Sequence, residues 1–147
     1  MEDASELRLG PEFDNVPCLS NAEVAIVLQE AKIKFEQDDK AVPEVFEQTL
    51  AYVNRFSQIK DPVVNKGVVQ ELESELEAKT WEKVDAEGNV GVVKLAPFEL
   101  VSLINLKPEE YDEAVSLIPS LQNKLNEDDV NDILDKINRS AGRTFNF

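Results

Sequence analysis

Apolar side chains recur at helical spacing along much of the chain. Positions three and four apart form one apolar stripe after Ser20 and another after Pro43, as expected for two amphipathic helices. The first stripe contains Val24, Val27, Leu28, Ala31 and Phe35, and the second contains Val42, Val45, Phe46, Thr49, Leu50, Val53 and Phe56. Ile26 and Ile33 lie off the first stripe, which indicates either a deeply buried helix or a second contact surface.

Local signals predict where these helices begin and end. Ser20 and Glu23 form a capping-box pattern, in which the hydroxyl and the carboxylate each bond the other residue's backbone N–H. Pro43 suits the first turn of the second helix, where a missing N–H costs nothing. Asp61 followed by Pro62 is expected to end that helix, because a proline disfavours helical backbone in the residue before it.

The middle of the chain is predicted to form a helix followed by a hairpin. Residues 66–83 are rich in good helix formers, which favours a helix over a strand with one carboxylate face. Trp81, near its end, is expected to pack on a helix pair. Residues 85–93 carry Gly88 and Asn89 between valines, a pattern typical of a loop or hairpin turn.

Three short helices are predicted in the last third. Pro97 and Pro108 suit first-turn positions and predict helices over Pro97–Leu106 and Pro108–Leu117. Asn126 is expected to cap a final helix with apolar residues at i, i+3, i+4 and i+7. The expected core of this region is Phe98, Val101, Ile118, Leu121, Ile133, Leu134 and Ile137. The sequence therefore predicts an all-α fold, a small helical bundle.

Composition narrows the function classes. The chain has 147 residues, a net charge of −15, no histidine and one cysteine. Nucleic-acid binding rests mainly on Lys and Arg, so we expect little or no direct nucleic-acid binding. Without histidine there is no Ser-His-Asp triad, and one cysteine cannot form an internal disulfide. The acidic N-terminus is unlike a signal peptide, and no apolar run is long enough to span a bilayer, so we expect a soluble, intracellular protein without membrane contact.

Three features that suggest chemistry do not support a catalytic or metal site. Asp85–Asn89 resembles the start of an EF-hand loop, but that loop needs Gly at position 6 and Glu at position 12, where this chain has Val90 and Ala96. The alternating glutamates of residues 71–77 have nothing that desolvates them. Cys18 has no histidine partner. We therefore expect no catalytic residue, no metal and no cofactor.

Basic and aromatic residues gather only near the C-terminus. This cluster contains Arg139, Arg143, Phe145 and Phe147. Such a combination can bind single-stranded nucleic acid, but the overall negative charge favours a tail that docks on a protein partner.

Several segments resemble the fourth subunit of eukaryotic RNA polymerase II. The resemblance rests on four segments in the family's order: residues 19–24, residues 43–57, Lys94-Leu95-Ala96-Pro97-Phe98-Glu99-Leu100 and Leu117-Ile118-Pro119-Ser120-Leu121. The end of the chain, with an Arg-x-Phe-x-aromatic tail, is similar as well. It covers about residues 7–55 and 94–147. Residues 61–93 form a variable acidic segment to which no role is carried over.

The resemblance implies a non-catalytic stalk subunit. It implies a fold similar to the helicase-and-ribonuclease-D C-terminal (HRDC) domain, with an extended partner-binding arm over residues 1–19 and the helical domain over residues 20–147. It also implies an obligate heterodimer with the seventh subunit near the RNA exit path, and attachment to the polymerase core through that subunit. Initiation, clamp closure and recruitment of transcription and mRNA-processing factors follow from the same resemblance. So does a nuclear location that allows shuttling to the cytoplasm.

The expected contact with the seventh subunit lies on the arm and on the first two helices. The residues are Leu7, Leu9, Phe13, Val24, Leu28, Ala31, Phe46 and Leu50. Two alternatives stay open. One is an acidic helical adaptor or histone-binding module, which would bind basic proteins in a salt-dependent way. The other is a calcium-binding helical protein.

Overall fold

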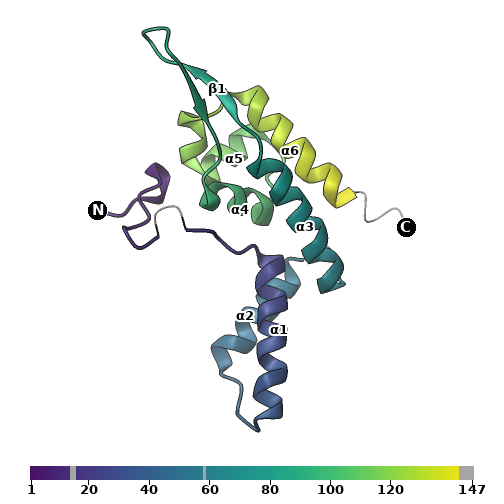
Figure 1. Ribbon diagram of the computed structural model, residues 1–147. Coiled ribbons are helices and arrows are strands. Elements are labelled where there is room, and N and C mark those ends of the chain that lie inside the picture. Colours follow the sequence, from purple (N-terminus) through teal and green to yellow (C-terminus); the bar gives the residue numbers. More distant parts are fainter. Residues whose placement is uncertain (14–15, 58, 143–147) are drawn as a thin grey trace. The chain divides into compact units, whose positions relative to one another are not determined.

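The chain is mostly helical (Figure 1). The computed structural model describes residues 1–13, 16–57 and 59–142. In order, these residues form η1 (Ala4–Glu6), α1 (Asn21–Gln37), α2 (Glu44–Arg55), α3 (Pro62–Glu77), β1 (Trp81–Val84), β2 (Val90–Val93), α4 (Pro97–Leu106), α5 (Tyr111–Leu117), η2 (Pro119–Asn123) and α6 (Glu127–Gly142). The all-α prediction is confirmed, with one antiparallel hairpin, β1–β2, added to it.

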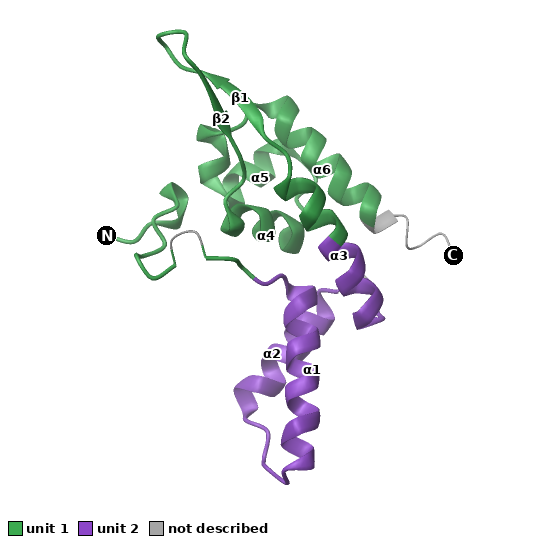
Figure 2. Cartoon of the chain, in the orientation of Figure 1, with its two compact units in different colours: residues 1–18, 71–147 green, residues 19–70 purple. Residues whose placement is uncertain are grey.

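The chain divides into two compact units (Figure 2). Unit 1 contains residues 1–18 and 71–147, and unit 2 contains residues 19–70, so the boundary falls within α3. The first eighteen residues thus belong to the same unit as the C-terminal helices. The predicted division into a partner-binding arm and an HRDC-like domain concerns function and family fold, and it stays a prediction.

Unit 2 is built on the helical pair α1 and α2, and its first helix begins as predicted. Glu23 N–H donates to Ser20 Oγ at 3.2 Å and Ser20 N–H donates to Glu23 Oε1 at 3.3 Å, which completes the capping box. Ala25, Leu50 and Val53 form a small buried cluster between the helices. Lys32 and Glu47 add an ion pair of 3.6 Å. Val24 and Leu28 pack against this cluster, and three of the five side chains are alanine or valine, so the core of the helical pair is small.

The two prolines of unit 2 differ from their predicted roles. Pro43 lies at the N-cap, one residue before α2, rather than inside its first turn. Pro62 begins α3 instead of ending α2, which already ends at Arg55. The reason is Asp61, whose carboxylate accepts the backbone N–H groups of Val63 at 3.0 Å and Val64 at 3.3 Å. An aspartate cap followed by proline is a favourable helix start.

Unit 1 holds the larger core. Its fully or nearly buried apolar residues come from α3 to α6, and α5 packs against both α6 and η2. They include Leu72, Leu76, Leu95, Leu100, Val101, Leu103, Ile104, Ala114, Ile118, Leu121, Leu125, Val130, Ile133, Leu134 and Ile137. All predicted core positions of this region are confirmed as buried except Phe98, which is half-buried. The predicted cap of the last helix is also confirmed, since Asn126 Oδ1 accepts Asp129 N–H at 2.8 Å.

Two predictions for unit 1 are wrong in detail. Pro108 does not open a helix, because α5 begins only at Tyr111. Instead Lys107 adopts the left-handed conformation (φ +48°) that ends α4, and the buried Pro108 follows as a helix stop. The helix predicted through residue 83 ends at Glu77, and Trp81 lies on β1, where it pairs with Val93 rather than packing on a helix pair.

Candidate interaction surfaces

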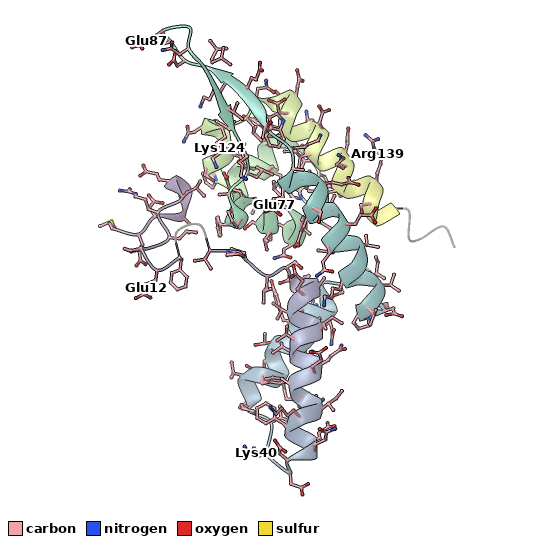
Figure 3. The ribbon with its side chains drawn as sticks, viewed as in Figure 1. Glu12, Lys40, Glu77, Glu87, Lys124 and Arg139 are labelled. Carbon is pink, nitrogen blue, oxygen red and sulfur yellow. The ribbon has the colours of Figure 1, made fainter. Side chains whose placement is uncertain are left out.

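A buried carboxylate joins α4 to η2 in unit 1. Glu99 is fully buried, and its Oε1 accepts the Ala96 backbone N–H at 2.9 Å and the Lys124 ammonium at 2.5 Å. Its Oε2 accepts the hydroxyl of Ser120, itself buried, at 2.7 Å. Lys124, labelled in Figure 3, also donates to Lys94 O at 3.2 Å. Both carboxylate oxygens are therefore satisfied.

This network joins two of the segments that carry the family resemblance. Glu99 belongs to the Lys94–Leu100 segment and Ser120 to the Leu117–Leu121 segment, and the structure brings the two side chains into direct contact. A buried ion pair with every hydrogen bond made holds its elements in one arrangement, and removing one partner is costly. Both oxygens of the Glu99 carboxylate already accept hydrogen bonds from this chain, so neither is free to bind a substrate. It is a structural joint between α4 and η2.

The first eighteen residues form one wall of a recess on unit 1. Asp3 and Arg8 pair their backbones around η1, and Leu7 and Leu9 are half-buried. The predicted arm is thus a compact turn before it becomes extended. The recess is lined by Leu7, Leu9, Phe13, Val16, Cys18, Ala96, Pro97, Phe98 and Lys124. Three of the predicted partner-binding residues, Leu7, Leu9 and Phe13, therefore lie together.

The predicted partner-binding residues of unit 2 mostly face inward. Leu50 is only 8% exposed, and Val24 and Leu28 are partly buried against its cluster. Phe46 meets Phe35 edge-to-face, with ring centroids 5.6 Å apart, and Ala31 is half-buried. These side chains therefore serve mainly to pack α1 against α2.

The apolar stripe predicted for α2 is divided in the structure, because part of it faces solvent while Leu50 and Val53 are buried. Val45, Tyr52 and Phe56 are 68%, 54% and 52% exposed. With Thr49 they recur at i, i+4, i+7 and i+11, which places them on one side of the helix. The Tyr52 and Phe56 rings lie 4.9 Å apart, and the Arg55 guanidinium lies 5.5 Å from the Phe56 ring centroid. We call Val45, Thr49, Tyr52 and Phe56 the outer α2 stripe.

Further exposed apolar side chains lie elsewhere in unit 2. They are Leu19, Val27, Ile33, Val63 and Val64. Contiguous exposed apolar surface on a soluble protein marks contact sites more often than single exposed residues do. Ile33, which the sequence pattern already set apart from the main stripe, is among the exposed residues, so a second contact surface on α1 is the better interpretation for that position.

The predicted C-terminal cluster falls largely outside the described residues. The residues outside the described part are Arg143, Phe145 and Phe147. Arg139 is exposed near the end of α6 (Figure 3). Among the described residues, no group of His, Cys, Asp and Glu side chains could hold a metal ion. In the same part of the chain no helix has the length and apolar character needed to cross a membrane.

The residues that resemble a calcium loop form an ordinary turn. Asp85 Oδ1 accepts the backbone N–H groups of Glu87 and Asn89, both at 2.9 Å, and Gly88 has the positive φ (+85°) that such a turn requires. These bonds, that from the Asn89 N–H above all, hold the pKa of Asp85 below its usual value. The Asp85 carboxylate is therefore occupied by its own turn.

Comparison with known proteins decides the family. A family model described as RNA polymerase Rpb4 matches residues 18–141. The chain belongs to this family. It is 36% identical to "DNA-directed RNA polymerase II subunit 4" of Arabidopsis thaliana, over 84% of this chain and 79% of the relative. It is 32% identical to "DNA-directed RNA polymerase II subunit rpb4" of Dictyostelium discoideum, over 99% and 91%. A Schizosaccharomyces pombe protein of that name is 29% identical, over 92% and 89%.

The resemblance to the fourth-subunit family is thereby confirmed. The match of the family model begins at residue 18, so it covers all of unit 2 but only the last two residues of the arm. It includes both ends of the Glu99–Ser120 joint.

Proposed function

We propose that the chain is the fourth subunit of RNA polymerase II, a non-catalytic subunit that works by pairing with the seventh subunit to form the stalk. Its relatives are named as subunits of that polymerase, which supports the general part of the proposal: that the chain is a subunit of RNA polymerase II and is located in the nucleus. Initiation, clamp closure and factor recruitment, with attachment to the core through the seventh subunit, are the finer part. Shuttling to the cytoplasm belongs to that finer part as well.

The observation that supports the heterodimer is that unit 2 has a small buried core and a larger exposed apolar surface. The buried apolar side chains of its helical pair, Ala22, Ala25, Leu50 and Val53, are mostly small, whereas the outer α2 stripe stays open to solvent. Full burial of one large apolar side chain is worth about 1.5–3 kcal/mol. Covering three such side chains would therefore offset a large part of the cost of association. A partner that covers this face would stabilise unit 2 and bind through it at the same time.

The proposed contact keeps the residues expected from the sequence but changes their roles. Leu7, Leu9 and Phe13 would meet the seventh subunit directly, at the recess on unit 1. Val24, Leu28, Ala31, Phe46 and Leu50 would support the contact from behind by fixing α1 against α2. The outer α2 stripe, with Val27 and Ile33 of α1, would supply the apolar surface that the partner covers in unit 2.

The experiment is affinity purification of the tagged full-length chain from its own cells, followed by quantitative mass spectrometry. We expect polymerase II core subunits, with the seventh subunit recovered in equal amount to the tagged chain. Recovery of histones or other basic proteins that are lost in high salt, without polymerase subunits, would support the adaptor alternative instead. Recovery of the core without the seventh subunit would overturn the heterodimer.

A further inference from the structure

A polar recess of unit 2 lies where α2 ends and α3 begins. Its volume is about 370 Å³, and sites for small ligands range from about 300 to 1,000 Å³. The polar residues that line it are Gln29 of α1, Asn54 and Arg55 of α2, and Ser57 and Lys60 of the connection to α3. We call it the unit 2 recess. It shares no residue with the outer α2 stripe or with the recess on unit 1.

The unit 2 recess is basic in a chain that is strongly acidic. Arg55 and Lys60 line it, and no carboxylate of the described residues does. The chain has 30 acidic and 15 basic residues, but residues 48–70 contain three basic residues and a single acidic one, Asp61. The Asp61 carboxylate accepts two backbone N–H groups at the start of α3 and so caps that helix. The recess therefore fits an anion.

Four donor side chains of the unit 2 recess are available to a ligand. In the part of the chain that the structure describes, the Gln29 and Asn54 amides and the Lys60 ammonium make no hydrogen bond or ion pair. The Arg55 guanidinium contacts the Phe56 ring, with its central carbon 5.5 Å from the ring centroid. A guanidinium stacked on a ring keeps the N–H groups in its plane for hydrogen bonds. Two cations and two amides can therefore converge on one ligand.

The charge and number of these donors match a phosphate monoester better than a carboxylate. A phosphate on serine or threonine carries a charge of about −1.5 to −2 and three acceptor oxygens, whereas a carboxylate carries one charge. Arginine binds phosphate through two parallel N–H···O bonds, which leaves Lys60 and the two amides for the remaining acceptor positions. Ser57 adds no donor, because its hydroxyl already donates to Val53 O at 2.7 Å.

The surroundings of the unit 2 recess favour a protein as the carrier of the phosphate. Nucleic-acid binding requires that many phosphates along a strand be neutralised, to which a chain with a net charge of −15 is poorly suited. Ile59 and Pro62, both half-buried, give the recess an apolar part. Residues beside a phosphorylated side chain can cover this part.

We propose that the unit 2 recess binds a phosphorylated serine or threonine of another protein. Arg55 and Lys60 neutralise the phosphate, and Gln29 and Asn54 complete its hydrogen bonds. Docking of that protein then requires its phosphorylation. The site does not depend on the seventh subunit.

The test uses fluorescence anisotropy with the full-length chain and labelled five-residue peptides. The peptides carry phosphoserine, glutamate or serine at the centre of the same alanine–glycine sequence. We expect the phosphoserine peptide to bind about tenfold more tightly than the glutamate peptide, and inorganic phosphate to displace it. Equal binding of the phosphoserine and serine peptides, or no displacement by inorganic phosphate, would overturn the proposal. So would tighter binding of a labelled oligouridine than of the phosphoserine peptide, which would indicate a nucleic-acid ligand.

Two double variants with the same change in net charge locate the site. Arg55→Gln with Lys60→Gln removes both cations of the unit 2 recess, and we expect it to weaken binding of the phosphoserine peptide by about tenfold or more. The matched control, Lys34→Gln with Lys40→Gln, removes two exposed lysines of unit 2 that do not line the recess (Lys40 is labelled in Figure 3). We expect the control to bind like the wild type. An equal loss in the two double variants would indicate unspecific attraction of charge and contradict the proposal.

Two single variants test the hydrogen bonds without removing a charge. Gln29→Met keeps the length of the side chain but removes the amide, and we expect it to weaken binding of the phosphoserine peptide about threefold. Arg55→Lys keeps the charge but loses the paired N–H donors, so we expect a loss smaller than that of the double variant. Wild-type affinity in both single variants would contradict the proposed set of hydrogen bonds.

Discussion

Glu99→Ala is expected to destabilise unit 1 by about 3 kcal/mol, because it removes the acceptor of a buried ion pair and of two further hydrogen bonds. Ser120, which is buried, and the Ala96 N–H would lose their partner, while Lys124, whose side chain is 23% exposed, would regain some contact with water. For a unit of this size the loss corresponds to a fall in melting temperature of roughly 10 to 20 °C. Thermal unfolding followed by circular dichroism measures it.

Two variants separate this effect from the loss of any glutamate. Glu77→Ala removes an exposed carboxylate at the end of α3 and is expected to shift the midpoint by no more than a surface substitution does, about 0.5 kcal/mol or less. Glu99→Gln keeps the shape but brings an amide N–H₂ toward one of the three donors, so we expect an intermediate loss. If Glu99→Ala unfolded at the same temperature as Glu77→Ala, the Glu99 network between α4 and η2 would contribute nothing measurable to the stability of unit 1.

Replacing Val45 and Tyr52 together by aspartate is expected to weaken the heterodimer about 100-fold. Each change removes an exposed apolar side chain that the proposed partner would bury, worth at least one factor of ten per residue. The isolated chain should stay folded, because both side chains already face solvent and aspartate at Val45 suits the first turn of α2. Titration of the seventh subunit by isothermal calorimetry measures the affinity.

The matched control for this pair is Leu117→Asp in α5. Leu117 is 49% exposed, close to the value for Tyr52, but it belongs neither to the outer α2 stripe nor to the residues that line the recess on unit 1. We expect wild-type affinity for the seventh subunit. By contrast Leu28→Asp is a poor test of the interface, since Leu28 packs against the Ala25–Leu50–Val53 cluster and its loss would disturb the helical pair itself. Unchanged affinity of the Val45 and Tyr52 double variant would remove the outer α2 stripe from the interface.

Features that depend on neighbouring residues could be predicted from the sequence. The Ser20 capping box and the Asn126 cap are each fixed by side chains three residues from their backbone partners, and both are confirmed. The same holds for α4, whose bounds follow from Pro97 and its apolar spacing. The role of Pro62 could not be read this way, because Asp61–Pro62 can end one helix or cap the next, and only the position of α3 decides.

Features that depend on distant residues could not be predicted. Glu99 and Ser120 are 21 residues apart, and the sequence around each of them contains no pattern that predicts a hydrogen bond between them. Helical periodicity placed Leu50 on an apolar stripe, but periodicity does not tell whether that stripe meets a helix of the same chain or another protein. Leu50 is buried within unit 2, whereas Val45 and Phe56 of the same predicted stripe, with Tyr52, are exposed.

Amide hydrogen exchange of the full-length chain, alone and with an excess of the seventh subunit, tests the central claim most directly. The thin core of unit 2 predicts low protection of α1 and α2 in the free chain, since local stability follows buried apolar contacts. The account predicts that protection of these two helices rises strongly in the complex, whereas α5 and α6, which do not line the recess, exchange as before. Protection of α1 and α2 that is already high in the free chain and does not change on adding the seventh subunit would contradict it.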